Sequence, residues 1–296
     1  MLSLDPKELP QPKLHQYLLG AIGPRPIAFA STLDAEGRPN LAPYSFFNVF
    51  SSNPPILIFS PARRGRDNTT KHTLENALVT KECVINIVNY AMVEQMSLAS
   101  TEYPEGVSEF TKTGLTPIAS EVVKPFRVKE APVQFECKIN DVVALGTQGG
   151  AGNLVICEVV RIHVAEDILD EDGRISPIKI DQVARMGGHF YTRANQGLFQ
   201  LPQPMTQVGI GFDSMPEDVR TSEVLTGNEL AQLAGVESLP NETEVNEYKL
   251  TELADLFMEY EGRAGELEQQ LHHKAKALVT EKKIAEAWMT LLAFNN

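Results

Sequence analysis

The chain has 296 residues, of which 43% are hydrophobic and 22% are charged, a balance typical of a globular protein with its own core. This length suits one large domain or two ordinary ones. The net charge is −13, and an excess of negative charge disfavours binding to the phosphate backbone of nucleic acids. The apolar runs fall short of the ~20 residues that a membrane span requires, so we expect no membrane segment.

The charge is unevenly distributed. Residues 1–204 hold 22 acidic and 19 basic residues, whereas residues 205–296 hold 17 acidic and 7 basic residues. Cys83, Cys137 and Cys157 lie in apolar runs without metal-site spacing, so we expect reduced core thiols and no metal site. The first residues, MLSLDPKELPQPK, lack a secretory apolar stretch. We therefore predict a cytoplasmic protein whose near-neutral first part can bind an anionic cofactor.

The first expected strands follow Gly20. Residues 27–33 form a strand-length run, residues 34–37 (DAEG) supply a turn, and a second run opens at residue 40. This pattern predicts a β-hairpin. A third run occupies residues 55–60, so we expect three strands in this region. Polar residues are crowded onto the middle one, namely Asn40, Tyr44, Ser45 and Asn48.

Such polar side chains need hydrogen-bonding partners, because an unpaired buried polar group costs roughly 1–3 kcal/mol. A polar ligand lying along the sheet would provide these partners. The alternative is that one face of the strand is in contact with water, which is a common arrangement in antiparallel sheets.

A basic segment follows the third strand. Residues 61–73 read PARRGRDNTTKHT and precede a helix-like stretch at 73–80. Cations, hydroxyl groups and the backbone N–H groups of a helix start together predict an anion site. The alternative is a solvated basic loop.

The next elements predict a mainly β domain with some helix. The connection GTQGGAG at 146–152 leads from one strand to another, so it is a hairpin and not a dinucleotide-binding loop. The remaining expected elements are a strand at 83–89, a helix at 90–100, a loop-rich stretch at 102–117, an alternating strand at 131–139, a long strand at 153–164 and a turn at 170–173.

Several motifs in this order resemble the flavin reductase-like family. They are PRPIA at 24–28, NLAPYSFFN at 40–48, NPPI at 53–56 and RMGGHFY at 185–191, the last resembling a motif of the flavoredoxin-like branch. The resemblance covers roughly residues 12–191. It implies a split β-barrel domain that binds FMN, in a homodimer with the cofactor near the interface.

The resemblance also implies site residues. Lys71-His-Thr73 followed by Asn76 stands where the family has Lys-Asp-Thr and a later Asn, a segment that holds the FMN phosphate. The residues expected near the ring or ribityl chain are Pro43, Tyr44, Ser45, Asn48 and Asn86. Those expected around the phosphate are Ser60, Arg63, Arg66, Asn68, Thr69, Lys71, His72 and Thr73. Arg185, His189 and Tyr191 are expected to close the site.

The sequence departs from one subgroup of the family. Gly152-Asn-Leu154 stands where two-component flavin reductases carry Gly-Asp-His. We see no catalytic side-chain constellation, so a flavin would carry the redox step. The first hypothesis is an FMN-dependent oxidoreductase with a small-molecule donor, such as NADH or NADPH, and a small-molecule acceptor. The alternatives are a flavoredoxin-like electron carrier without a pyridine-nucleotide site, and a binding module without catalysis.

The composition changes at QLPQP, residues 200–204, which we interpret as a linker. We therefore predict an FMN-binding split-barrel domain at 1–204 and an acidic helical extension at 205–296. Thr226-Gly-Asn-Glu229 predicts a capping box, and apolar residues recur at helical spacing up to Leu292. The extension contains no catalytic constellation, so we interpret it as a packing or oligomerisation element.

Overall fold

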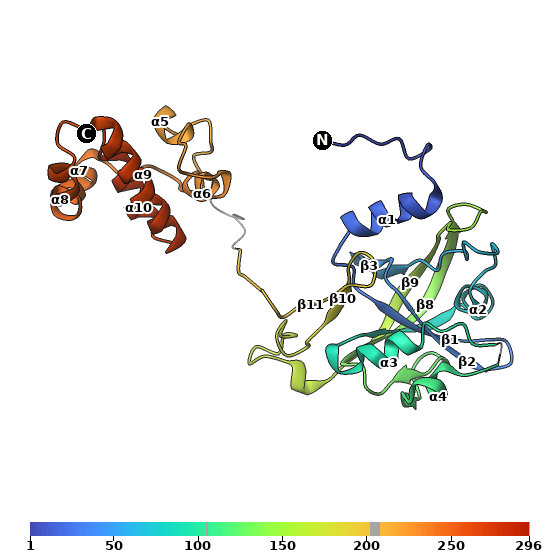
Figure 1. Cartoon of the computed structure of the whole chain (residues 1–296). Helices are drawn as coiled ribbons and strands as arrows, with labels where there is room; N and C mark the ends of the chain where they lie inside the picture. The colour runs from blue at the N-terminus through green and yellow to red at the C-terminus, as the bar shows by residue number, and fades with distance from the viewer. Residues whose placement is uncertain (105, 202–207, 296) are drawn as a thin grey trace. The chain divides into compact units, whose positions relative to one another are not determined.

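The computed structural model describes residues 1–104, 106–201 and 208–295 of the protein. The chain divides into two compact units, Met1–Phe199 and Gln200–Asn296 (Figure 1). The boundary predicted from the sequence, between residues 204 and 205, lies outside the described residues.

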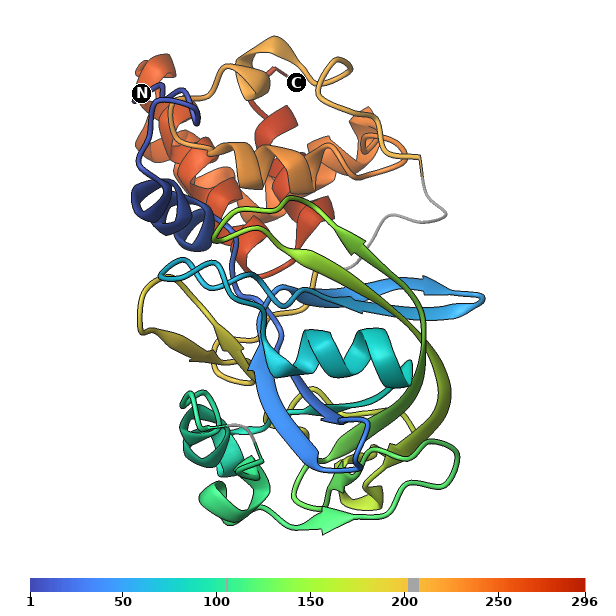
Figure 2. The same ribbon diagram turned by 90° about the vertical axis from the view of Figure 1, so that its right-hand side faces the viewer.

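Unit Met1–Phe199 is built on a seven-stranded antiparallel sheet, in the order β2-β1-β5-β8-β9-β4-β3. The long strands β8 and β9 are strongly curved (Figure 2). The predicted mainly β fold is confirmed. The sheet's strands are β1 Ala28–Leu33, β2 Pro39–Tyr44, β3 Phe47–Ser52, β4 Pro55–Phe59, β5 Glu82–Ile87, β8 Val133–Ala144 and β9 Asn153–Val164. Two small hairpins pair β6 Pro117–Ile118 with β7 Arg127–Val128, and β10 Val183–Arg185 with β11 Tyr191–Arg193.

Short helices lie between these strands. The helix predicted at 73–80 is α2, and the one predicted at 90–100 is a 3-10 turn followed by α3. The helices and 3-10 turns of this unit are α1 Gln11–Ala21, α2 His72–Thr80, η1 Tyr90–Met92, α3 Val93–Leu98, α4 Glu109–Thr113 and η2 Glu166–Ile168.

The expectation of three strands between residues 20 and 60 was wrong, because the middle run forms two strands. The chain breaks after β2, and β2 and β3 then occupy opposite edges of the same sheet. The sheet curls, so its two edges approach: the ring of Tyr44, at the end of β2, lies 5.4 Å from the ring of Phe59 on β4. Tyr44 and Asn48 therefore do not share one strand.

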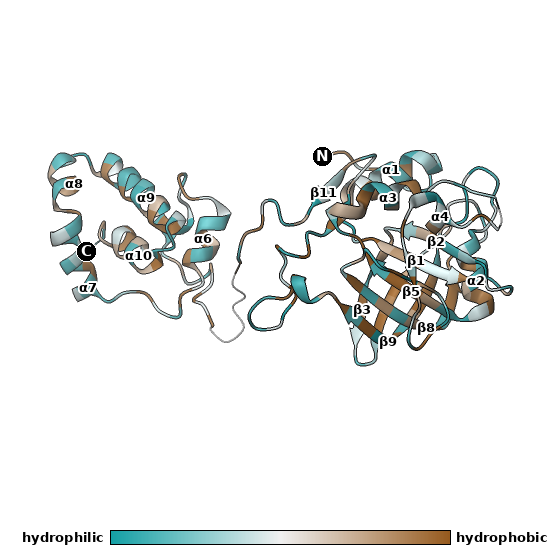
Figure 3. Cartoon of the chain, turned by 90° about the horizontal axis from the view of Figure 1, so that it is seen from below, coloured by the Kyte–Doolittle hydropathy of each residue, from teal (hydrophilic) through white to brown (hydrophobic). Residues whose placement is uncertain are grey.

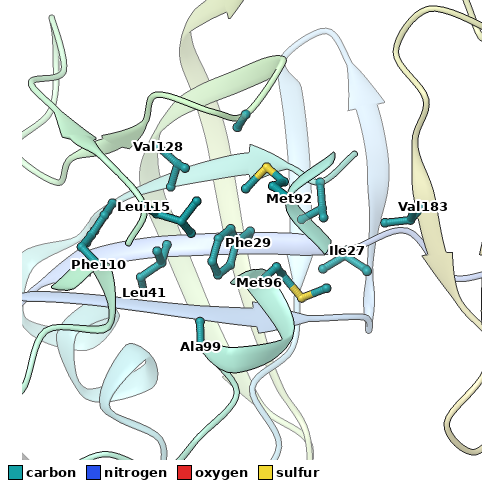
Figure 4. Close-up of a cluster of buried hydrophobic side chains, with 12 residues drawn as sticks. Ile27, Phe29, Leu41, Met92, Met96, Ala99, Phe110, Leu115, Val128 and Val183 are labelled. Atoms are coloured by element: carbon teal, nitrogen blue, oxygen red, sulfur yellow. The ribbon is translucent and has the colours of Figure 1, made fainter. Parts of the chain in front are cut away.

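Strand β1 is buried along its whole length and separates two apolar clusters. On one side Phe29 packs with Met92, Met96 and Phe110 (Figure 4). The other cluster lies inside the curved sheet and contains Ala28, Ala30, Leu57, Phe59, Leu74, Ala77, Cys83, Ile85, Cys137, Ile139, Val155 and Cys157. Helix α2 contributes Leu74 and Ala77 to it, which fixes the helix against the sheet.

The predicted alternation along β8 is confirmed for its apolar face, but Glu136 on the opposite face is also fully buried. Its carboxylate accepts hydrogen bonds from the N–H groups of residues 121, 122 and 123 at 2.8, 2.6 and 3.0 Å. His163 Nε2 lies 2.7 Å from Oε1 of Glu136. His163 is therefore a hydrogen-bonding partner of a buried carboxylate.

Unit Gln200–Asn296 is helical and has its own apolar core. Its helices are α5 Glu217–Arg220, α6 Gly227–Leu233, α7 Glu242–Glu252, α8 Ala254–Glu259, α9 Ala264–Thr280 and α10 Ile284–Leu292. The capping box predicted at Thr226 and Glu229 is present. Trp288 is fully buried, and its Nε1–H donates to Leu233 O at 3.0 Å. Hydrophobic and hydrophilic residues alternate along the elements of both units (Figure 3).

Within the described ranges of the chain, every helix is too short or too polar to span a membrane.

Candidate functional site

Three neighbouring cavities share lining residues, and the first two contain residues from the end of β2 or just after it. The anion cavity, about 110 Å³, is lined by Asn40, Ala42, Pro43, Tyr44, Arg64, Lys71, His72, Thr73, Ala99, Ser100, Thr101, Glu102, Tyr103 and Glu109. The central cavity, about 80 Å³, is lined by Ile27, Pro43, Ser45, Met96, Ser100, Arg185 and Tyr191. The outer cavity, about 450 Å³, is lined by Tyr90, Val93, Glu94, Ser97, Val183, His189, Tyr191, Thr192, Arg193 and Gln196. Pro43 and Ser100 join the first two cavities, and Tyr191 joins the last two.

The basic loop at 61–71 is held rigidly beside the anion cavity. Arg63 Nε–H donates to Asn68 Oδ1 at 2.7 Å, and Asn68, with a φ of 58°, donates to Thr147 O at 3.0 Å. The glycine-rich hairpin packs against this loop, since Gly150 N–H donates to Arg63 O at 3.0 Å. Arg63 and Asn68 therefore shape the loop, whereas Arg64 and Lys71 line the cavity.

Arg64 is fixed on the wall of the anion cavity. Its guanidinium donates to Thr69 Oγ1 at 3.0 Å and also to Thr70 O. Glu102 faces it from the stretch after α3, with Oε1 2.9 Å from Arg64 Nε. Hydrogen bonds from Arg64 and Arg66 lower the pKa of Glu102 below its usual value, so this carboxylate is charged at neutral pH.

Helix α2 begins at the same cavity. It starts at His72, with no side-chain cap from the described residues, and its first residues His72 and Thr73 line the cavity. Thr73 is buried, and its hydroxyl accepts from Asn40 Nδ2 at 2.8 Å. Burial raises the pKa of Tyr44 to about 12, against a smaller opposing effect of its hydrogen bond with Thr73. Tyr44 is therefore a neutral hydroxyl group at neutral pH.

Glu109 is a second carboxylate on this wall. It is buried and accepts from the backbone N–H of Leu41 at 3.0 Å. Burial raises the pKa of Glu109 above its usual value. The anion cavity thus contains two carboxylates whose pKa values are shifted in opposite directions.

The central cavity is lined by Arg185, and Arg25 lies behind its wall, next to Ser45. Arg185 donates to the Tyr191 hydroxyl at 2.8 Å and to Gly188 O at 2.9 Å. Arg25 is buried and donates to Leu19 O and Met186 O, both at 2.8 Å, with its Nε 3.5 Å from Ser45 Oγ. Burial and the charge of Arg185 lower the pKa of Arg25. Arg25 still keeps its positive charge at neutral pH, because arginine ionises well above it.

The two glycines of the 185–191 motif have separate structural roles. A Cβ at Gly187 would lie 3.1 Å from Cα of Gly20, the closest heavy atom, so the chain approaches α1 closely at this point. Gly188 has a φ of 60°, which a glycine adopts without strain.

The outer cavity is bordered by an ion pair. Arg193 donates to both carboxylate oxygens of Asp181, at 2.6 and 2.7 Å. Its guanidinium also lies 4.2 Å from the centre of the Tyr90 ring. This arrangement fixes the strand that carries Tyr191.

The structure brings together many of the predicted residues, from distant parts of the sequence. Those that line the three cavities are Pro43, Tyr44, Ser45, Lys71, His72, Thr73, Arg185, His189 and Tyr191. Arg66 and Thr69 lie next to them, since Arg66 pairs with Glu102 and Thr69 accepts from Arg64.

The other predicted residues lie elsewhere. Asn48 is exposed on β3, where its Oδ1 accepts from Val49 N–H at 2.8 Å. Ser60 is buried and accepts from Asn153 N–H at 3.0 Å. Asn86 is fully buried. Its side-chain amide donates a hydrogen bond to Phe29 O at 3.0 Å and accepts one from the N–H of Val128 at 2.9 Å. These contacts give Ser60 and Asn86 a role in the sheet.

Five further residues belong to this region: Arg25, Arg64, Ser100, Glu102 and Glu109. The sequence signals Arg64 only as one of three arginines in RRGR, and local pattern does not tell which of them faces the cavity. Glu102 and Glu109 lie in a loop-rich stretch, where no periodic pattern predicts the direction of a side chain.

Comparison with known proteins identifies the family. The flavin reductase like domain matches residues 21–179, more than half of the chain. Nitrilotriacetate monooxygenase component B from Bacillus cereus is 35% identical, with a TM-score of 0.64, over 68% of this chain and 98% of its own. The 2-nitrobenzoate 2-nitroreductase from Pseudomonas fluorescens is 26% identical, with a TM-score of 0.63, over 71% of this chain and 100% of its own.

A protein with a split barrel domain from Shewanella frigidimarina is similar as well. It is 29% identical, with a TM-score of 0.57, over 67% of this chain and 96% of its own. The matched part of the chain carries the curved sheet and most of the three cavities. The chain therefore belongs to the flavin reductase-like family, with a split-barrel unit followed by a helical unit.

Proposed function

We propose that this protein is an oxidoreductase that binds FMN across the three adjoining cavities. The observation that carries the proposal is the shared walls: Pro43 and Ser100 join the anion cavity to the central one, and Tyr191 joins the central to the outer one. FMN is a long ligand with a phosphate at one end and a planar ring at the other. A polar cleft with cations at both ends suits its shape and charge.

The residues present fit this ligand. Arg64, Lys71 and the start of α2 would hold the phosphate, because cations and helix N–H groups both favour an anion. Tyr44 and Asn40 would face the ribityl hydroxyls. Pro43, Met96 and Tyr191 would border the ring, and the bound flavin would supply the hydride or electron chemistry.

The role of Arg185 follows from its charge. A reduced flavin carries more negative charge at its N1–C2 edge than the oxidised form, so a fixed cation nearby favours reduction. Arg185 is held by two hydrogen bonds, to Tyr191 and Gly188. It would therefore meet the developing charge without having to reorganise.

The outer cavity is the candidate site for a small-molecule electron donor or acceptor, because it adjoins Tyr191 and has a volume of about 450 Å³. NADH and NADPH are the donors we propose to test first. The relative from Pseudomonas fluorescens is named for the reduction of a small nitroaromatic acid, which supports a small-molecule acceptor.

The flavoredoxin-like alternative also has support. Leu154 stands where two-component reductases carry their histidine, and the neighbouring Asn153 is buried, with its side chain donating to Pro61 O at 2.9 Å. This segment therefore offers no histidine for a pyridine nucleotide. NAD(P)H oxidation decides between the two candidates.

We further propose a cytoplasmic homodimer. Edge strand β3 and the residue before it expose large apolar side chains, with exposed fractions of 40% for Phe46 and 63% for both Val49 and Phe50. An apolar sheet edge is normally covered, so we propose that β3 forms the dimer interface. Sedimentation of wild type and Val49→Glu tests the proposed dimer. If β3 forms the interface, wild type should sediment as a dimer and the Val49→Glu variant as a monomer.

The three cysteines are buried free thiols, which supports the proposed reducing compartment.

One experiment tests the central proposal. Fluorescence titrations measure the affinities of wild type, Arg64→Ala and Lys71→Ala for FMN and riboflavin, with exposed Lys129→Ala as a control. We expect the first two variants to lose FMN affinity about tenfold or more and riboflavin affinity little, because a charge-assisted hydrogen bond is worth about 1.5–3 kcal/mol. Absence of FMN binding by wild type, or equal losses for both ligands, would contradict the proposal.

A steady-state assay then identifies the class of reaction. Oxidation of NADH or NADPH by the FMN-loaded protein, with free flavin or a nitroaromatic acid as acceptor, would support the oxidoreductase with a pyridine-nucleotide donor. A protein that binds FMN but oxidises neither nucleotide would support the electron carrier.

A further inference from the structure

The cations of the basic loop have an anionic partner within the protein itself. Oε1 of Glu102 lies 2.9 Å from Arg64 Nε and 3.6 Å from Lys71 Nζ. Its Oε2 lies 3.0 Å from a terminal guanidinium nitrogen of Arg66. Both oxygens of a single carboxylate are thus turned towards three cations, of which Arg64 and Lys71 line the anion cavity together with Glu102.

These donors suit a phosphate group equally well. Carboxylates and phosphates accept the same charge-assisted hydrogen bonds from arginine and lysine. A phosphate monoester carries about −1.5 to −2 charges and three acceptor oxygens, whereas Glu102 supplies one charge and two oxygens. A phosphate ester therefore has the advantage over Glu102 in both charge and number of acceptors, while a singly charged anion does not.

The exchange requires little rearrangement. Arg64 is also bound to Thr69 and to Thr70 O, so it stays in place when its carboxylate partner leaves. The Glu102 side chain is 43% exposed, so it can rotate into water. Ion pairs at such exposed sites are weak, and the stronger attraction of a dianion can exceed them.

We propose that Glu102 is an internal competitor for the anion cavity and that it sets the anion selectivity of this cavity. A ligand with a phosphate ester displaces the carboxylate, whereas singly charged anions do not. This inference rests on the proposed function only in naming FMN as the phosphate ester; the competition itself concerns the cations and Glu102.

The test compares Glu102→Gln with wild type. Flavin fluorescence measures the dissociation constants of FMN and riboflavin, and phosphorus NMR line broadening measures binding of inorganic phosphate. We expect the variant to bind FMN and phosphate about three- to tenfold more tightly than wild type, and riboflavin equally. Acetate should compete with FMN only in the variant. Glu171→Gln, in an exposed turn, removes the same charge elsewhere and should leave all these constants unchanged.

Each outcome decides the inference. Unchanged phosphate affinity in Glu102→Gln would overturn it. Weaker phosphate binding in both Glu102→Gln and Glu102→Ala would also overturn it, because Glu102 would then be needed to position the arginines. If wild type binds phosphate but not FMN, the proposed function fails. The phosphate affinity of Glu102→Gln relative to that of wild type still decides whether Glu102 competes for the cavity.

Discussion

The guanidinium of Arg185 donates a 2.8 Å hydrogen bond to the hydroxyl of Tyr191 and lies 4.7 Å from the centre of the same ring. The two residues end and begin the paired strands β10 and β11, with Gly187 and Gly188 between them. Buried Arg25 lies against this hairpin through an antiparallel bridge to Arg185. The motif therefore places a fixed positive charge and an aromatic ring side by side on the central cavity.

The first prediction concerns this charge. Arg185→Ala should lower the reduction potential of bound FMN by about 20–40 mV, equivalent to about 1–2 kcal/mol for a two-electron couple. Spectroelectrochemical titration measures the shift. Arg174→Ala is the matched control, because Arg174 is 77% exposed in a turn. An unchanged potential in Arg185→Ala would leave the motif with a structural role only.

The second prediction concerns the glycine-rich hairpin. A Cβ at Gly149 would lie 3.1 Å from Arg64 O and from Cα of Gly65, so Gly149→Ala should push the basic loop away from the cavity. FMN affinity should fall several-fold, while riboflavin affinity should change little. Gly65 is the partner of Gly149 in this contact. In Gly65→Ala, the added Cβ would meet no atom of the described residues within 4 Å, so this variant should bind FMN normally. Equal behaviour of the two variants would contradict this account.

The third prediction concerns acid stability. Burial alone would raise the pKa of Glu136, but hydrogen bonds from the backbone N–H groups of residues 121–123 and from His163 outweigh it and hold this pKa at about 2. Because the pKa is lower in the folded state than the usual 4.5, the stabilisation is present above pH 4.5. It is lost as the pH falls from 4.5 towards 2.

Urea denaturation at several pH values checks this expectation. Glu136→Gln should unfold more easily at pH 7, by about 2–4 kcal/mol, because three N–H donors lose a charged acceptor. Its stability should also change less between pH 5 and pH 3 than that of wild type. Glu158→Gln on neighbouring β9 removes an exposed partner of Asn140 and should behave like wild type.

The fourth prediction concerns the helical unit. Trp288 is the single tryptophan of the chain and lies in the core of this unit, so its fluorescence reports on the unfolding of this unit. Leu291→Ala should lower the free energy of unfolding by about 2–5 kcal/mol, because Leu291 is 1% exposed. Leu250→Ala is the control, with Leu250 76% exposed.

FMN binding should be retained in both leucine variants. The clusters that border the three cavities contain residues of unit Met1–Phe199, whereas Leu291 belongs to a cluster of the helical unit. Loss of FMN affinity in Leu291→Ala, with Leu250→Ala unaffected, would show that the two units depend on each other.

Much of the secondary structure could be predicted from the sequence. The turn Asp34–Gly37 and the glycine-rich turn at 146–152 each join strands that pair with one another, as expected. The capping box at Thr226 and helix α2 were predicted as well. Turn chemistry, caps and periodicity act over a few residues, so the chain carries these signals locally.

The position of the site depended on pairings between distant residues. The run that opens at Asn40 and carries Tyr44 and Asn48 looks like one strand, but the closure of the sheet places β2 and β3 at opposite edges, and Asn48 consequently lies apart from Tyr44. Asn86 is a polar residue on a strand, which suggests a ligand contact. In the structure, the backbone N–H of Val128 donates to the side-chain oxygen of Asn86 instead.

The family motifs indicated both ends of the proposed FMN site, at Lys71 and at Arg185, because they belong to short stretches of sequence. Only the tertiary structure selected Arg64 from the three arginines of the basic loop and placed Glu102 opposite it, 38 residues further along the chain. The direction of a loop side chain is set by the surfaces packed around it. Those surfaces form only when the sheet curls and brings distant segments together.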